Sequence, residues 1–165
     1  MNKLILIRYL LLMLLITYSY VHADEQFDIS HTKAAGTLVI DCRDGNPAML
    51  GVMQYQQSHL VFSPPGGWLN GGEHPKQGAV RETKEETGYT VIAEKLLGSP
   101  PMMFNVYMLV LASVDKSKPV SSNTQEVVSV KWVNPSDIPI EDWRFPNQRQ
   151  WIIDLFATYA PEDCG

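Results

Sequence analysis

Short apolar runs separated by turn residues recur along the chain, and they predict strands on both sides of one helix. Strands are expected at 36–41, 48–55, 59–62, 90–95, 103–114 and 126–133. The turn residues Arg43–Pro47 predict that the first two strands form a hairpin. Helices are expected at 75–87, where Pro75 suits the first turn, and at 147–159, where apolar residues recur at helical spacing. The pattern indicates a mixed α/β fold.

The first 23 residues have the pattern of a cleaved export signal. Lys3 and Arg8 give a positive start, an unbroken apolar run follows, and Val21–Ala23 offers residues that a signal peptidase accepts. Because the apolar run is too short to span a bilayer comfortably, we expect cleavage rather than a stable membrane anchor. An uncleaved anchor and a buried N-terminal helix are the alternatives. The expected organisation is a signal peptide, 1–23, and one domain, 24–165, of an exported protein, either periplasmic or secreted.

Composition narrows the classes of partner. The chain has 165 residues, of which 45% are hydrophobic and 19% charged, so one domain with a packed core is expected. The formal net charge is -5 and no basic patch is present, which argues against nucleic acid as a partner. An acidic protein that handles anionic substrates needs metal ions to bridge the charge repulsion.

The chain has two cysteines, Cys42 and Cys164. Two are too few for a disulfide scaffold or for a zinc site with four cysteine ligands. Export would place both in an oxidising compartment, where a single disulfide persists. The sequence leaves open whether they form this bond or remain two thiols.

The candidate chemistry lies in the expected helix 75–87. Glu82, Glu85 and Glu86 fall at i, i+3 and i+4, which puts three carboxylates on one face. Like charges at this spacing repel, and a hard divalent cation such as Mg²⁺ resolves the conflict. A solvated acidic face is the alternative. Arg81 lies beside this cluster and can pair with Glu73 or Glu82.

The segment from Gly67 to Tyr89 resembles the Nudix box, G-x5-E-x7-R-E-U-x-E-E-x-G-U, in which U is bulky and apolar. Its seven fixed positions are filled by Gly67, Glu73, Arg81, Glu82, Glu85, Glu86 and Gly88. Thr83 and Tyr89 depart from the apolar type at two U positions, and neither is a ligand position. The resemblance implies an α/β fold, namely a Nudix-type α/β/α sandwich with a mixed sheet in a single domain.

The resemblance also implies a pyrophosphohydrolase that cleaves a diphosphate linkage in a nucleoside diphosphate joined to another group. It implies Mg²⁺, with Mn²⁺ as a second metal that fits, held by Glu82, Glu85, Glu86 and the carbonyl of Gly67. Glu73 is expected to orient Arg81, which together with Glu82 and Glu85 is a candidate catalytic residue. Glu126 is a further candidate for the general base; a strand-end carboxylate without function is the alternative.

Residues outside the box are expected to select a small-molecule diphosphate substrate. Phe62, Trp68 and Phe104 could stack on a base or could pack in the core. Tyr107 lies 18 residues past the box, a spacing associated with dinucleoside polyphosphate cleavers, although a core role is the alternative. Residues 143–145 could rim the site. Two other functions remain open, which are hydrolysis of lipid diphosphates at the membrane face and a non-catalytic nucleotide sensor. The oligomeric state is open.

Overall fold

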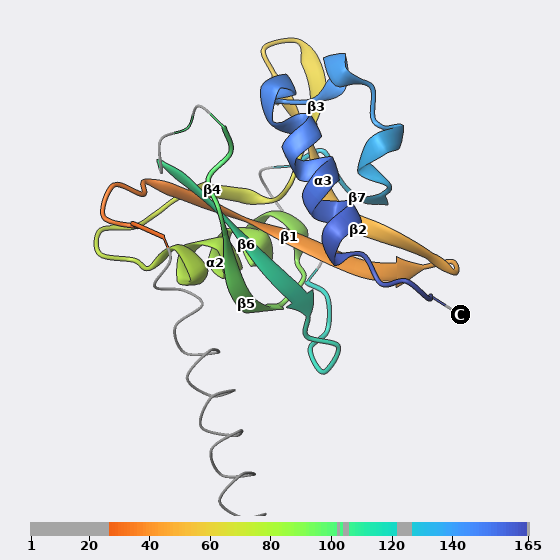
Figure 1. The fold of residues 1–165 in the computed structure, drawn as a ribbon, viewed down its shortest axis with the longest axis horizontal. Helices are drawn as coiled ribbons and strands as arrows, with labels where there is room; N and C mark the ends of the chain where they lie inside the picture. Colours follow the sequence, from red (N-terminus) through yellow and green to blue (C-terminus); the bar gives the residue numbers. More distant parts are fainter. Residues whose placement is uncertain (1–26, 102, 104–105, 122–126, 165) are drawn as a thin grey trace, which may run out of the picture.

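The computed structural model describes residues 27–101, 103, 106–121 and 127–164 of the chain (Figure 1). The expected signal peptide, Glu126 and Phe104 therefore lie outside the described residues. The described strands are β1 (Ala34–Arg43), β2 (Asn46–Gln56), β3 (His59–Ser63), β4 (Gly66–Trp68), β5 (Val91–Gly98), β6 (Tyr107–Val114) and β7 (Ser129–Val133). The described helices are α2 (Pro75–Thr87) and α3 (Arg149–Tyr159), and three short 3₁₀ turns lie between β7 and α3.

One mixed sheet holds these strands together, and β1 is its centre. The main strand order is β3-β2-β1-β6-β5, with β4 paired to β1 and β7 paired to β2. β1 runs parallel to β6 and antiparallel to β2 and β4. Its first residues pair with β4 and β6, and its last residues pair with β2. This single long strand therefore joins two parts of the sheet.

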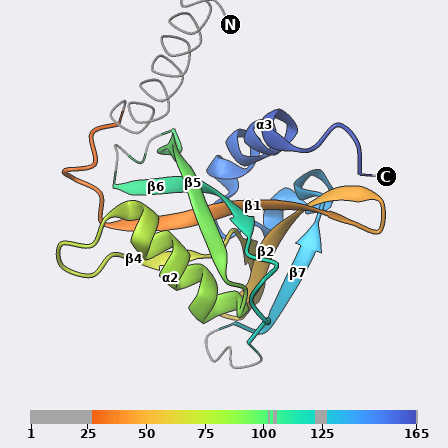
Figure 2. The same cartoon turned by 90° about the horizontal axis from the view of Figure 1, so that it is seen from below.

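The two helices cover opposite faces of the sheet (Figure 2). Alternate residues of a strand point to opposite faces. On β1, Ala35 packs in the cluster with Ala79 of α2, whereas Leu38 packs with Ile152 and Phe156 of α3. The α/β/α sandwich with a mixed sheet is therefore confirmed.

Helix α2 begins and ends where the sequence predicts. His74 caps its N-terminus, because its Nδ1 accepts the backbone N–H of Lys76 at 3.2 Å. The side chain of Gln77 accepts the backbone N–H of His74 at 3.3 Å and completes a capping box. Gly88 ends the helix with a φ of 75°, a left-handed conformation that glycine adopts without strain.

The strands β1, β2 and β5 are longer than the predicted ranges 36–41, 48–55 and 90–95, and three larger differences concern β4, β6 and β7. Residues 66–68, where no strand is predicted, form β4, which pairs with the start of β1 (Ala35 with Gly67, Gly36 with Gly66). β6 begins at Tyr107 rather than at residue 103, because the N–H of Val106 donates to the carbonyl of Met103 in a turn at 2.8 Å. β7 begins at Ser129 rather than at residue 126. Apolar content alone thus overestimated the length of two strands.

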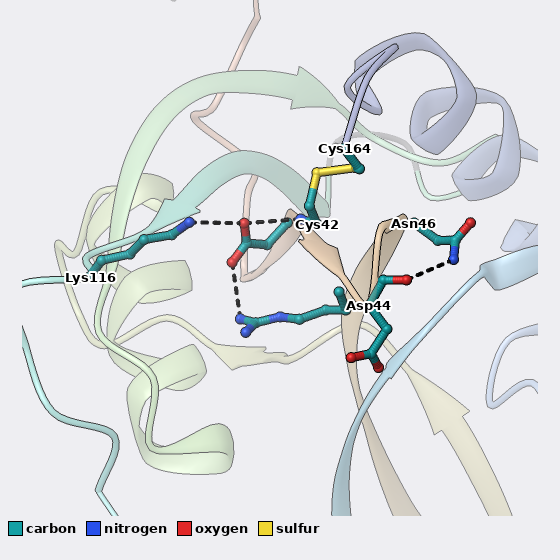
Figure 3. Close-up of a disulfide and its surroundings, with 7 residues drawn as sticks. Cys42, Asp44, Asn46, Lys116 and Cys164 are labelled. Atoms are coloured by element: carbon teal, nitrogen blue, oxygen red, sulfur yellow. Dashed lines mark hydrogen bonds and ion pairs between the residues drawn. A yellow bond between two sulfur atoms is a disulfide. The ribbon is translucent and has the colours of Figure 1, made fainter.

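A disulfide joins Cys42 to Cys164, with their Cα atoms 5.4 Å apart (Figure 3). Cys42 lies near the end of β1, and Cys164 lies in the tail that follows α3. Beside the disulfide, the carboxylate of Asp41 pairs with Arg43 at 3.0 Å and with Lys116 at 3.2 Å. Of the two alternatives left open by the sequence, a disulfide or two thiols, the structure has the disulfide.

None of the helices within the described ranges has both the length and the apolar character that a bilayer crossing requires.

Candidate active site

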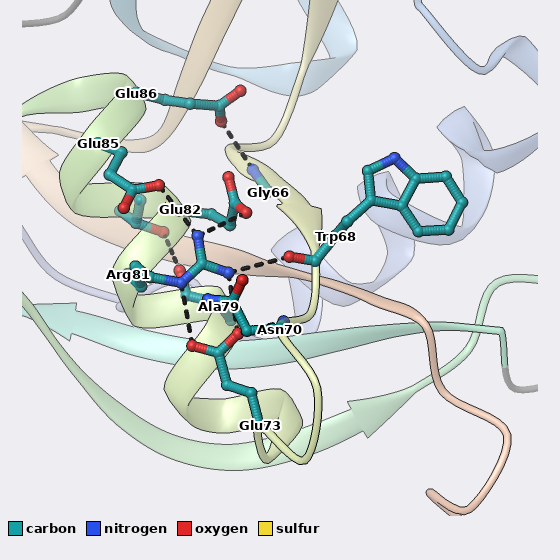
Figure 4. Close-up of polar contacts among 10 residues, drawn as sticks. Gly66, Trp68, Asn70, Glu73, Ala79, Arg81, Glu82, Glu85 and Glu86 are labelled. Carbon is teal, nitrogen blue, oxygen red and sulfur yellow. Dashed lines mark hydrogen bonds and ion pairs between the residues drawn. The ribbon is translucent and has the colours of Figure 1, made fainter.

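Three carboxylates of α2 line the side of the helix that faces β4 (Figure 4). Glu86 is buried, and its Oε2 accepts the backbone N–H of Gly66 at 2.8 Å. The Glu82 side chain is 13% exposed, whereas that of Glu85 is 54% exposed. The i, i+3 and i+4 spacing therefore produces the shared face that the sequence predicts, but with a gradient from a buried carboxylate to an accessible one.

Gly67 allows the backbone of β4 to approach this face. A Cβ atom at Gly67 would lie 2.5 Å from the carboxyl carbon of Glu82, closer than real Cβ contacts allow. A side chain at this position would displace the end of the Glu82 side chain, so glycine lets the strand and this carboxylate lie close together, which is a recognised use of glycine within a strand. This close approach gives a physical reason for the glycine that opens the box.

Arg81 ties the carboxylates to the loop that precedes the helix. Its Nε and one Nη donate to the two oxygens of Glu73 at 3.0 and 2.9 Å. Its other Nη donates to Glu82 at 2.8 Å and to Glu85 at 3.0 Å. The carbonyl of Trp68 accepts a further bond at 2.9 Å (Figure 4). The pairing of Arg81 with Glu73 and Glu82 is as predicted, and the contact with Glu85 adds to it.

The Glu73–Arg81 pair shifts the titration of both groups. The hydrogen bonds from Arg81 hold the pKa of Glu73 below its usual value, and the backbone N–H of Asn70 lowers it further. The carboxylate of Glu73 in turn raises the pKa of Arg81, with Glu82 adding to the effect. Both groups therefore remain charged at neutral pH, and their bidentate contact fixes the guanidinium plane.

Two departures from the apolar pattern of the box have structural roles. Thr83 is fully buried, and its hydroxyl bonds the hydroxyl of Thr37 on β1 at 2.7 Å and the carbonyl of Ala79 at 2.7 Å. Tyr89 accepts a hydrogen bond from the indole of Trp132 at 3.2 Å. Polar groups at these positions are therefore satisfied and attach α2 and its following residue to the sheet.

The carboxylates fit a hard divalent cation by their chemistry. Glu82, Glu85 and Glu86 and the carbonyl of Gly67 offer only oxygen ligands, which Mg²⁺ prefers. Within the described part of the chain, however, no three acidic, histidine or cysteine side chains converge on one point. An Nη of Arg81 bonds both Glu82 and Glu85 (Figure 4). The oxygen ligands that a divalent cation needs are present, and two of the carboxylates, Glu82 and Glu85, are bonded to Arg81.

Tyr107 lies next to this face, at the start of β6. Its hydroxyl lies against Gly36 of β1, where a Cβ atom would collide with that hydroxyl and with the carbonyl of Pro65. Burial raises the pKa of Tyr107, and the negative charge of Glu86 raises it further, while the positive charge of Arg144 opposes both. The phenol is therefore neutral at physiological pH and lies within electrostatic reach of Glu86 and Arg144.

Two other residues expected to bind substrate differ in exposure, because Trp68 lies at the surface and Phe62 lies in the core. Trp68 is 73% exposed, and its indole points away from the carboxylates (Figure 4). Phe62 has no exposed surface, because its ring packs edge-on against Trp143 with the centroids 5.1 Å apart. In this placement Phe62 is a core side chain. Phe104 and Glu126 lie outside the described residues, so their predicted roles stay predictions.

Two glycines near the carboxylate face have roles that were not predicted from the sequence. No site role is predicted for Gly66 from the sequence, yet its N–H donates to the carboxylate of Glu86. Gly36 was interpreted as part of a strand, yet it makes room for Tyr107. A glycine inside a strand pattern signals close approach of another group, and that signal was available at Gly36.

Comparisons with known proteins support these observations. A family profile that describes the NUDIX domain matches residues 30–155. A Bacillus subtilis (strain 168) protein with the provisional name 8-oxo-dGTP diphosphatase is 32% identical over 97 residues, covering 58% of this chain and 63% of that protein. A Schizosaccharomyces pombe (strain 972) protein named as an uncharacterised Nudix hydrolase is 30% identical over 103 residues, covering 59% of this chain and 50% of that protein.

A solved structure has the same fold. The crystal structure of a NUDIX hydrolase from Nitrosomonas europaea superposes with a TM-score of 0.59 and 21% identity, covering 78% of this chain and 72% of that one. At this identity the likeness concerns the fold alone. The chain also spans between half and two thirds of the length of the two curated relatives, 50% and 63%.

Proposed function

This chain belongs to the NUDIX family, and on that premise we propose that it is an exported, Mg²⁺-dependent hydrolase of a diphosphate linkage in a nucleoside diphosphate joined to another group. The observation that carries the proposal is the complete set of three carboxylates on one face of α2, packed against a glycine-containing strand. A sensor without catalytic activity would not need to keep all three carboxylates. The complete set therefore favours an enzyme.

Glu82, Glu85 and Glu86 and the carbonyl of Gly67 would hold the metal. When bound, Mg²⁺ supplies charge neutralisation for the diphosphate and lowers the pKa of a bound water. The accessible Glu85 and the buried Glu86 then have different tasks. Glu86 is held in place by the N–H of Gly66, whereas Glu85 is free to change its partner on ligand binding.

Arg81 acts as the positioning residue of this arrangement. Its bonds to Glu82 and Glu85 offset part of the negative charge of these two carboxylates. If those carboxylates turn to a ligand, Glu73 and the carbonyl of Trp68 still hold the guanidinium beside the helix. Glu73 therefore keeps Arg81 close to the site while Glu82 and Glu85 exchange partners.

Hydrolysis also needs a base. Water attacks one phosphorus, the bond to the bridging oxygen breaks, and a carboxylate takes the proton of the water. Among the described carboxylates of α2, Glu85 is more exposed than Glu82 (54% against 13%) and can be reached by water. Glu85 is therefore our first candidate for the base, and Glu126 is the second.

Two residues are proposed to contact the substrate outside the diphosphate. Trp68 presents an exposed indole directly after the backbone that meets Glu82, so it can stack on a nucleobase. Tyr107 places a neutral hydroxyl near Glu86, where it can donate a hydrogen bond to an anionic oxygen. The buried Phe62 supports Trp143 instead and is not included in this set.

Export is proposed from two observations. The first 23 residues have the pattern of a signal peptide, and Cys42 is bonded to Cys164. Structural disulfides persist in oxidising compartments and are rare where thiols are kept reduced. Both observations support a periplasmic or secreted location for a protein that begins after Ala23.

A broad substrate panel tests the proposal. The chain from residue 24 onward is incubated with nucleoside diphosphate sugars, nucleoside triphosphates, dinucleoside polyphosphates and detergent-solubilised lipid diphosphates, in Mg²⁺, in Mn²⁺ and in EDTA. We expect Mg²⁺-dependent hydrolysis of at least one nucleotide and none in EDTA. Hydrolysis of lipid diphosphates alone would replace the nucleotide proposal, and binding without hydrolysis would favour a sensor.

A further inference from the structure

A cavity of about 420 Å³ lies beside the first turn of α2. Residues of the segment 29–33 form one wall and the loop 69–75 forms the other, and the two segments lie side by side in both views of the fold (Figures 1 and 2). The backbone fixes this arrangement, because the N–H of Leu69 donates to the carbonyl of Lys33 at 2.8 Å and the N–H of Lys33 donates to the carbonyl of Val106 at 2.8 Å. A volume of this size holds a small organic group.

Glu73 belongs both to this cavity and to the carboxylate face. It lines the cavity, and its two oxygens accept the Nε and one Nη of Arg81 at 3.0 and 2.9 Å. The other Nη of that guanidinium bonds Glu82 and Glu85. One guanidinium therefore separates the cavity from the carboxylates that would hold the metal. The side chains of Arg81 and Glu73 keep 27% and 14% of their surface exposed, so a ligand can lie across this pair.

The strand that meets Glu82 leads directly into the cavity. A Cβ atom at Gly67 would lie 2.5 Å from the carboxyl carbon of Glu82, and the side chain of Leu69 packs against α2 at Gly78. An extended chain rises about 3.3 Å per residue, so Gly67 and the cavity wall at Leu69 are roughly 7 Å apart. One phosphate and the first ring attached to it span such a distance. The indole of Trp68 points away from the carboxylates (Figure 4), so a nucleobase stacked on it does not compete for the cavity.

The polar groups that line the cavity are donors and acceptors without a net charge. Lys33 and Glu73 are its two charged side chains. Glu73 has about four lone-pair positions, of which Arg81 and the N–H of Asn70 use three, so one acceptor position is left. The Nδ1 of His74 accepts a backbone N–H in the helix cap, which places the ring proton on Nε2 as a donor. The exposed amide of Asn70 offers both a donor and an acceptor.

We propose that this cavity binds the group that the substrate carries beyond its diphosphate, and that this group is a sugar. The inference rests on the proposed function and narrows its substrate class to nucleoside diphosphate sugars. A further phosphate would bring negative charge against Glu73, and an apolar group would leave the polar groups of Lys33 and Asn70 facing it without partners. A ring with several neighbouring hydroxyls can donate to Glu73 and accept from Lys33 and Asn70.

The test compares two substrates that share the nucleoside and the diphosphate, a nucleoside diphosphate hexose and the cyclohexyl ester of the same nucleoside diphosphate. The two rings are similar in size, and only the hexose has hydroxyls. Wild-type protein is expected to prefer the hexose by about tenfold or more in kcat/KM. Asn70→Ala leaves the backbone N–H that bonds Glu73 and should lower this preference by about 3–10-fold. Lys33→Met should have a similar effect, whereas Lys131→Met, at an exposed position of β7, is the matched control and should keep the preference.

Hexose analogues that each lack one hydroxyl give a second readout. Removal of the hydroxyl that Asn70 binds should lower kcat/KM of the wild type by about 3–10-fold and should cost the Asn70→Ala protein nothing further, because that hydrogen bond is already absent. A loss of stability alone would lower the values for all substrates equally and would not produce this coupling. Equal kcat/KM for the hexose and the cyclohexyl ester in the wild type, or no coupling between any hydroxyl and either variant, overturns the inference. Failure of the wild type to hydrolyse any nucleotide refutes the proposed function instead.

Discussion

The carboxylate face of α2 and the C-terminal tail are attached to the same strand in different ways. At the start of β1, Ala35 and Gly36 pair with β4, which meets Glu82 and Glu86. Near its end, Cys42 is bonded to Cys164. Residues 35 and 42 are seven apart on this strand, so the two points of attachment are roughly 23 Å apart along it.

The two attachments use different forces. The site depends on one arginine that bonds three carboxylates drawn from a stretch of 13 residues, 73–85. The tail depends on apolar packing of α3 and on one covalent bond across a sequence separation of 122. The site should therefore respond to changes of charge and pH, whereas the tail should respond to reduction. Substitutions or conditions that affect the carboxylate face but not the tail, or the tail but not the face, test this difference.

The largest effect is expected from Glu85→Gln. The substitution removes one charge from the proposed metal site, and on that proposal the loss of metal-based charge stabilisation should lower kcat by about 10²–10³-fold in Mg²⁺. The Glu85 side chain is 54% exposed, so its contact with Arg81 contributes less than about 1 kcal/mol to stability. The measurement is kcat together with the free energy of unfolding in denaturant.

Glu94→Gln is the matched control, because it removes a carboxylate charge from an exposed position on β5. It should leave both kcat and stability near the wild-type values. Turnover near the wild-type rate in the Glu85→Gln variant would mean that this face is not the metal site, and the assignment of the carboxylates would be wrong.

The next effect is expected from removal of the disulfide. The double substitution of Cys42 and Cys164 by serine should lower the free energy of unfolding by about 2–4 kcal/mol, because the unfolded chain loses its largest constraint. For a chain of this size the midpoint temperature of thermal unfolding should decrease by on the order of 10 °C. At 25 °C, kcat/KM should stay within about twofold, because distant sites act independently.

Wild-type protein treated with dithiothreitol should match the double serine variant in stability. The dithiothreitol-treated variant is the control, and its midpoint should not move further. If activity at 25 °C falls together with stability, the tail and the carboxylate face are coupled and the comparison between them fails.

The difference between the two regions also explains what could be predicted from the sequence. Three features were predictable because they depend on groups within one short stretch, where spacing determines which side chains meet. They are helix α2, the left-handed Gly88 that ends it, and the pairing of Arg81 with Glu73. The disulfide depends on the whole path of the chain between Cys42 and Cys164. The spacing of those two residues in the sequence does not show whether they meet in the fold. Whether they form a disulfide could therefore be decided only from the structure.

The same reason accounts for the site residues that were not identified or were placed differently. β4 is stabilised by pairing with the start of β1, although its own residues have the composition of a turn. Phe62 is buried because Trp143, from a segment far along the chain, packs on its ring. Nothing adjacent to Phe62 in sequence separates a core aromatic from one that stacks on a ligand.

The smallest effect on stability is expected from Glu73→Gln. Its dependence on pH distinguishes the carboxylate face from the tail. Arg81 lowers the pKa of Glu73 in the folded protein below its model-compound value of 4.5. A carboxylate with a lowered pKa stabilises the fold above its unfolded pKa, and this contribution is lost as the pH falls through the folded pKa. Wild-type stability should therefore decline below about pH 4.5, and Glu73→Gln should reduce that decline.

At neutral pH the Glu73→Gln variant should be less stable by on the order of 1 kcal/mol, because the side chains of Arg81 and Glu73 keep 27% and 14% of their surface exposed, and the two proteins should converge at lower pH. Unfolding in denaturant at a series of pH values measures both curves. The double serine variant is the comparison, since a disulfide does not titrate and its loss should shift stability equally at every pH. If Glu73→Gln shows that same uniform shift, charge does not hold the carboxylate face, because only a titrating pair makes the loss depend on pH.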